Sequence, residues 1–125
     1  MAEQKKEPLV RYLDEARPID CPYGNVRRIV TGGAGGVANV HVVSVTKGSM
    51  HYHKAYDEVY YVLSGTGTIA LNGQTYALRP GAAAVIPAGV PHELLANDGS
   101  VLEFIIFGTP AMDINDERAK PMKPA

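Results

Sequence analysis

Short runs of β-branched and aromatic residues alternate with glycine, proline and asparagine along most of the 125-residue chain. Alternation of apolar and polar positions over a few residues is typical of half-buried strands, and closely spaced turns indicate an all-β sandwich or barrel. About nine strands are expected, over 26–30, 37–46, a run through 51–53, 58–63, 66–71, 74–78, 82–86, 92–96 and 101–107. Asn72-Gly73, between two of these runs, predicts a tight hairpin.

The two ends of the chain have a different pattern. Apolar residues recur at helical spacing between Leu9 and Ala16, which predicts a short helix over 9–17. The alternative is an extended arm that reaches a neighbouring subunit. We therefore expect an N-terminal tail and arm over 1–17 and one barrel domain over 18–110. A C-terminal tail over 111–125 is expected to pack as a short helix or to stay loose.

Composition narrows the function classes. Hydrophobic residues make up 46% of the chain, enough for one packed core at this length. A net charge of −1 and a pI near 6.4 give no field that would favour nucleic acid or an anionic membrane. No apolar stretch is long enough to cross a bilayer, and no signal peptide is visible, so a cytoplasmic location is expected. The single cysteine, Cys21, excludes an internal disulfide and is expected to be a packing residue.

Candidate metal ligands gather in two stretches. His51 and His53 are separated by one residue and are followed by Glu58. Residues i and i+2 of a strand point to the same face, so the two imidazoles would project side by side. His92 follows Pro87-Ala88-Gly89 further along the chain. Three imidazoles and a carboxylate suit a divalent transition metal.

These two stretches resemble the motifs of the cupin superfamily. The first motif corresponds to His51-x-His53, Glu58 and Gly65, and the second to Gly81, Pro87, Gly89 and His92. Two departures occur: only two residues separate Gly48 from His51, and Asn97 falls one residue later than the usual Asn. The resemblance implies a single-domain jelly-roll barrel, also called a double-stranded β-helix. It also implies a metal held by His51, His53, Glu58 and His92, with Mn, Fe, Ni, Zn, Co and Cu all open.

Such a site favours a small, anionic, oxygen-chelating molecule, because a divalent ion and one carboxylate leave a net positive charge. Dioxygenase-like chemistry is the favoured interpretation. A metal-dependent isomerase, decarboxylase or lyase is an alternative, as is a cupin that binds a sugar or other small molecule without catalysis. The resemblance further implies a homodimer.

Three residues outside the motifs are candidates for contact with a substrate. Tyr60 shares the parity of Glu58 and should face the same side of its strand, whereas Tyr61 should face away. His41 has the parity of Val43 and could act as an acid or base in the pocket, although a histidine hydrogen-bonded at the barrel surface is the simpler interpretation. Arg28 either clamps a carboxylate or faces water at a sheet edge.

Overall fold

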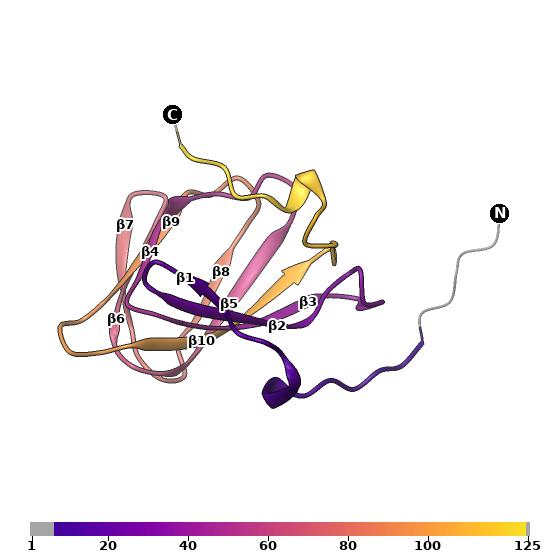
Figure 1. Ribbon diagram of the computed structural model, residues 1–125. Helices are drawn as coiled ribbons and strands as arrows, with labels where there is room; N and C mark the ends of the chain where they lie inside the picture. Colours follow the sequence, from indigo (N-terminus) through magenta and orange to yellow (C-terminus); the bar gives the residue numbers. More distant parts are fainter. Residues whose placement is uncertain (1–6, 125) are drawn as a thin grey trace.

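Two antiparallel sheets form the protein, as seen in a computed structural model that describes residues 7–124 (Figure 1). One sheet has the order β1-β2-β3-β10-β5-β8, and the other has the order β4-β9-β6-β7. The strands are β1 Ile19–Cys21, β2 Gly24–Val30, β3 Asn39–Val45, β4 Lys47–His51, β5 Asp57–Ser64, β6 Gly67–Leu71, β7 Gln74–Leu78, β8 Ala83–Ile86, β9 His92–Ala96 and β10 Leu102–Thr109. The predicted all-β jelly-roll fold is confirmed.

Alternating burial places one face of each long strand toward the interior. In β5, Glu58, Tyr60 and Val62 are buried, whereas Tyr61 is exposed. Successive side chains of a strand point to opposite faces, which explains this pattern. Val62 packs with Ile69 of the facing sheet in the core, and both are almost fully buried. The core therefore lies between the two sheets, and the inward polar residues of β5 sit beside it.

Glycine is required at two of the turns. Asn72 and Gly73 have φ angles of 50° and 86°, the left-handed pair that a two-residue hairpin needs, and β6 and β7 pair across them as predicted. Gly65 has a φ of 88°, and a side chain there would run into the carbonyl of Val101. A conformational requirement thus explains the motif glycine at position 65 without any catalytic role.

The N-terminal segment corrects two expectations. The helix predicted over 9–17 is wrong, since only a 3₁₀ turn forms, at Leu13–Glu15. Its apolar side chains, among them Val10 and Tyr12, are exposed, and an isolated short helix has too little stability without a packed face. β1 was not predicted, and it pairs with β2 at the edge of the sheet. Cys21, at its end, is exposed and is not the packing residue expected from the sequence. Residues 1–6 lie outside the described part of the chain.

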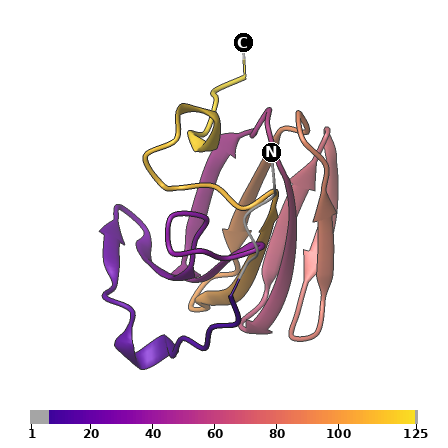
Figure 2. The same cartoon turned by 90° about the vertical axis from the view of Figure 1, so that its right-hand side faces the viewer.

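The C-terminal segment crosses one end of the barrel, as Figures 1 and 2 show in yellow. A 3₁₀ turn at Glu117–Ala119 is the short helical element that was one of the two expected outcomes. Tyr52 and Met122 then pair through two backbone hydrogen bonds of 2.9 and 2.8 Å. The tail is therefore a wall of the barrel end. No helix within residues 7–124 is long and apolar enough to cross a membrane.

Candidate metal centre

Three histidines converge at the end of the barrel that the tail crosses. His51 is the last residue of β4, His92 is the first residue of β9, and the two are direct partners in the sheet register. His53 lies two residues beyond the end of β4, so it is placed by a loop and not by the strand that the sequence predicted. One ligand atom from each of the three lies within 4.8 Å of the others. The structure thus brings the three predicted histidines together.

Hydrogen bonds determine which nitrogen of His51 and of His92 faces the centre. His51 Nδ1 lies 2.7 Å from the carbonyl of Ser49, and His92 Nδ1 lies 2.9 Å from the carbonyl of Val90. A carbonyl can only accept, so each Nδ1 carries the proton and donates it. Both Nε2 atoms are left with a free lone pair, which is the form of imidazole that binds a metal.

Tyr56 determines which ring nitrogen of His53 carries the proton. Its hydroxyl lies 2.7 Å from His53 Nδ1 and donates to the Ala119 carbonyl at 3.2 Å. Because the hydroxyl proton is given to Ala119, the Nδ1 of His53 must be the donor in the bond to Tyr56. The Nε2 of His53 is then free like the other two. Tyr56 was not predicted from the sequence, because its role depends on the distant C-terminal tail.

Glu58 is the fourth predicted ligand and is buried in β5. Its Oε1 atom lies 3.5 Å from His53 Nε2 and 3.6 Å from His92 Nε2. Burial raises the pKa of Glu58 to about 7, and a hydrogen bond from Tyr60 partly opposes that shift. A bound cation would favour the ionised carboxylate, so the group is suited to charge compensation at this point.

Burial also keeps His53 and His92 neutral. It lowers the pKa of His53 to about 3, with further lowering by His51 and His92, and it lowers the pKa of His92 to about 4. The close contacts between these rings and Glu58 are therefore not ion pairs at neutral pH. Ligands that share one metal at about 2.1 Å lie about 3.0–3.4 Å apart in octahedral or tetrahedral geometry. The observed 3.5 and 3.6 Å are close to that spacing. The three histidines form the cluster that could hold a metal, and Glu58 lies beside two of them.

Tyr60 is buried beside these groups, as its parity with Glu58 predicted. Its hydroxyl lies 3.2 Å from His92 Nε2 and 3.5 Å from Glu58 Oε1. A hydroxyl carries one proton and can donate to only one of the two at a time. Burial raises the pKa of Tyr60 well above its usual value, and the carboxylate of Glu58 adds to that effect. Tyr60 is therefore a neutral proton donor next to the centre.

A cavity of about 540 Å³ extends from the histidines into the barrel. Val43, Phe104 and Ile106 form much of its apolar wall. Arg28 and His41 line it from the β2–β3 side, so the interpretation of His41 as a surface histidine is wrong. His41 Nε2 is buried and has no hydrogen-bond partner within the described residues. Burial, and then the charge of Arg28, lower the pKa of His41 to about 4.

Comparison with known proteins agrees with this geometry. The family model for the cupin domain matches residues 39–109. The chain belongs to the cupin family. A crystal structure of a protein from Planctomyces limnophilus is 33% identical, with a TM-score of 0.76 over 88% of this chain and 95% of that one. A predicted oxalate decarboxylase from Thermotoga maritima has the same fold at 20% identity, with a TM-score of 0.68 over 80% of this cupin and 97% of that chain.

Part of the chain is also similar in sequence to a curated protein. The 5-aminosalicylate 1,2-dioxygenase of a Comamonas species is 43% identical to this cupin over 54 residues. That alignment covers 43% of the chain but only 14% of the relative. The likeness is therefore to a small part of a much longer protein.

Proposed function

We propose that this cupin is a metal-dependent enzyme that acts on a small, oxygen-chelating organic anion. The convergence of His51, His53 and His92 is the observation that carries the proposal, since their ligand atoms lie within 4.8 Å of one another and each Nδ1 atom is engaged by a hydrogen bond. Glu58 would complete the set of ligands. The apolar cavity beside them has the size of a small-molecule site.

A divalent metal held by these four residues would polarise a chelating oxygen of the substrate and leave room for a further small ligand. Neutral histidines and one carboxylate leave a +2 ion with a net charge of about +1, which selects an anion. The apolar wall of the cavity excludes water and strengthens that attraction. Tyr60 holds a proton next to the centre and can donate it to a substrate oxygen.

Oxygen-dependent oxidation is the favoured chemistry. The partial likeness to a dioxygenase that acts on a hydroxylated aromatic acid supports this choice. Decarboxylation is the second candidate, supported by the fold similarity to a predicted oxalate decarboxylase. Isomerase and lyase chemistry, and binding of a sugar or other small molecule without turnover, remain alternatives, because one barrel serves many reactions.

The test begins with metal analysis of protein purified without a histidine tag. Protein loaded with Fe(II) or Mn(II) is then incubated with hydroxy acids, diketones, catechols and keto-sugars, with and without oxygen. Oxygen consumption coupled to loss of one compound is the expected result. Conversion without oxygen would transfer the proposal to decarboxylase, isomerase or lyase chemistry. Saturable binding with no conversion would favour a binding protein.

Tyr60→Phe tests the proton donor once a substrate is known. Turnover should fall by about 100-fold or more, a typical contribution of general acid catalysis, while the metal stays bound. Tyr61→Phe is the matched control, since Tyr61 lies on the same strand and is exposed on the other face. Equal turnover of the Tyr60→Phe variant and the wild type would remove Tyr60 from the mechanism.

A homodimer in the cytoplasm is part of the same proposal. β1, β8 and β7 are strands at sheet edges, and exposed edges are surfaces where a second chain can pair. Apolar side chains of the N-terminal segment, such as Tyr12 and Leu13, add exposed contact area. Light scattering at micromolar concentration should report twice the mass of one chain, and a monomer would contradict the proposal.

A further inference from the structure

Four side chains stand in one row across the larger sheet. Arg28 of β2 is the register partner of His41 of β3, and His41 is the partner of Ile106 of β10. Ile106 is in turn the partner of Tyr60 in β5. All four line the cavity, so the row runs along its floor. It joins the candidate metal centre, at Tyr60, to a pair of nitrogen-rich side chains at the other end.

The polar atoms at that second end are not engaged by the protein. His41 Nε2 is buried without a hydrogen-bond partner, a costly arrangement unless another molecule meets it. Among residues 7–124, no ion pair within 4.0 Å involves Arg28. Arg28 also borders an outer depression lined by Asp113, and no ion pair joins these two residues. The half-buried guanidinium of Arg28 and the imidazole of His41 therefore both lack a hydrogen-bond acceptor within the described chain, and a bound ligand could supply one.

The other cations of the cavity wall, Lys47 and Lys120, have partners. Lys47 lies over the ring of Tyr23, 5.4 Å from its centroid. Lys120 pairs with Glu117 at 2.9 Å. Glu58 belongs to the metal centre at the opposite end. Arg28 is thus the cation of the cavity wall without a partner of its own among the described residues.

From this row we infer that Arg28 and His41 form a second subsite, which binds a carboxylate of the substrate at the end away from its metal-chelating oxygens. The inference rests on the proposed function and narrows it to a class of substrate. A guanidinium pairs with a carboxylate through two parallel hydrogen bonds, and the neutral imidazole adds a third donor. Strands lie about 4.8 Å apart, so Arg28 is about 14 Å along the sheet from Tyr60, and His41 about 10 Å. A single aromatic ring or a short chain between the two groups spans that space once the side chains reach inward.

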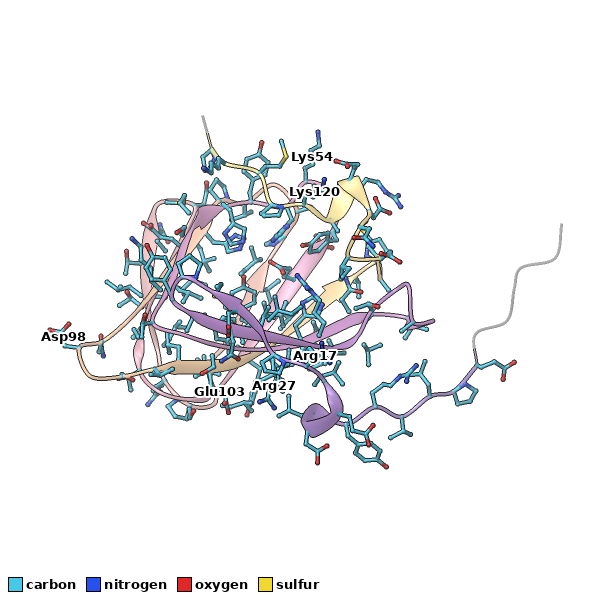
Figure 3. The ribbon with its side chains drawn as sticks, in the orientation of Figure 1. Arg17, Arg27, Lys54, Asp98, Glu103 and Lys120 are labelled. Carbon is cyan, nitrogen blue, oxygen red and sulfur yellow. The ribbon has the colours of Figure 1, made fainter. Side chains whose placement is uncertain are left out.

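Arg27 offers a matched control for Arg28. It is the neighbouring residue of the same strand, is the register partner of Val42 and is not part of the cavity wall. In Figure 3, Arg27 lies on the side of the molecule opposite the rim where Lys54 and Lys120 are labelled. The two arginines therefore share charge and strand but not direction.

The experiment uses protein loaded with Zn(II), which binds without redox turnover, and calorimetry as the readout. The probes are carboxylate and amide pairs on several chelating skeletons, among them 3,4-dihydroxybenzoate and 3,4-dihydroxybenzamide, with catechol as the reference. For at least one pair, the wild type should bind the carboxylate about tenfold or more tighter than the amide, a usual value for a hydrogen-bonded charge. Arg28→Gln should abolish that preference and leave catechol binding unchanged, whereas Arg27→Gln should preserve both.

Each outcome separates this inference from the proposed function. Zinc binding with no carboxylate preference in any pair would overturn the subsite and leave the metal centre intact. A preference that survives Arg28→Gln would overturn it as well. If zinc fails to bind, the proposed function falls, and the same pairs are titrated into the metal-free protein. Binding of a carboxylate that depends on Arg28 would then support the subsite alone, and its absence would overturn the subsite too.

Discussion

The two ends of the barrel cavity are built in different ways. At the metal end, His51, His53 and His92 are neighbours whose Nδ1 atoms are all held by hydrogen bonds. At the far end, Arg28 and His41 come from two adjacent strands, and His41 Nε2 has no partner within the described residues. The first end is preorganised for one spherical ion, whereas the second is open to a ligand of variable shape. Conserving a metal centre while changing the far end would let one barrel accept different substrates.

The largest expected effect is at the metal end. His53→Ala removes one of three converging imidazoles and should lower zinc affinity by more than about 100-fold, since even residues that only support ligands contribute 10- to 100-fold. Calorimetry with zinc measures it. His41→Asn is the control, because it removes the histidine of the same cavity that does not converge with the others. Equal zinc affinity of the His53→Ala variant and the wild type would contradict the assigned centre.

Tyr56→Phe tests how firmly the tail supports the centre. The change removes the hydroxyl between His53 Nδ1 and the Ala119 carbonyl, so His53 loses the partner that holds its proton on Nδ1. Zinc affinity should fall by about 10- to 100-fold. Nitrogen NMR of the imidazole should show a mixture of tautomers for His53 in the metal-free protein, a signature that a purely structural role would not produce. Tyr61→Phe should change neither quantity.

The pH dependence of stability tests the burial of His41 at the far end of the cavity. The pKa of His41 is about 4 in the folded protein, below the ordinary 6.5, because burial and then Arg28 disfavour its charged form. Between about pH 4 and 6.5 the unfolded chain binds a proton at this position that the folded protein does not, so stability rises with pH in that window. His41→Asn should reduce the slope for the metal-free protein by at most about 1.4 kcal/mol per pH unit. Urea unfolding of both proteins at several pH values measures the difference, and identical slopes would show that His41 titrates normally.

The smallest expected effect is that of Arg28→Gln on the protein without substrate. Zinc affinity should be unchanged, because Arg28 stands three strands from Tyr60 in the sheet. The pKa of His41 should rise only part of the way to its ordinary value, since burial is the larger cause of its lowering. Proton NMR titration of His41 measures the shift, with Arg27→Gln as the control. A large loss of zinc affinity would mean that the two ends of the cavity are coupled.

Much of the fold could be predicted from the sequence, because strands and tight turns have local signals. A run of β-branched and aromatic residues that ends at Gly65 predicted β5, turns on both sides predicted β9, and Asn72-Gly73 predicted the hairpin between β6 and β7. β1 had no such signal, since it is three exposed residues long and exists only through pairing with β2. The helix predicted over 9–17 failed for the opposite reason: a local pattern was present, but no packed surface was there to stabilise it.

Local sequence was enough to predict the ligand types of the candidate metal centre. Short spacings within a strand or turn allow few conformations, so His51, His53 and Glu58 could be assigned to one site from their separation and from the motif they share with cupins. Three further features depend on the tertiary fold. They are the hydrogen bonds that link His53 through Tyr56 to the tail, the inward position of His41, and the register that places Arg28 opposite His41. Each depends on which strands become neighbours when the barrel closes. That choice is made by the packing of the whole core, and no short stretch of sequence encodes it.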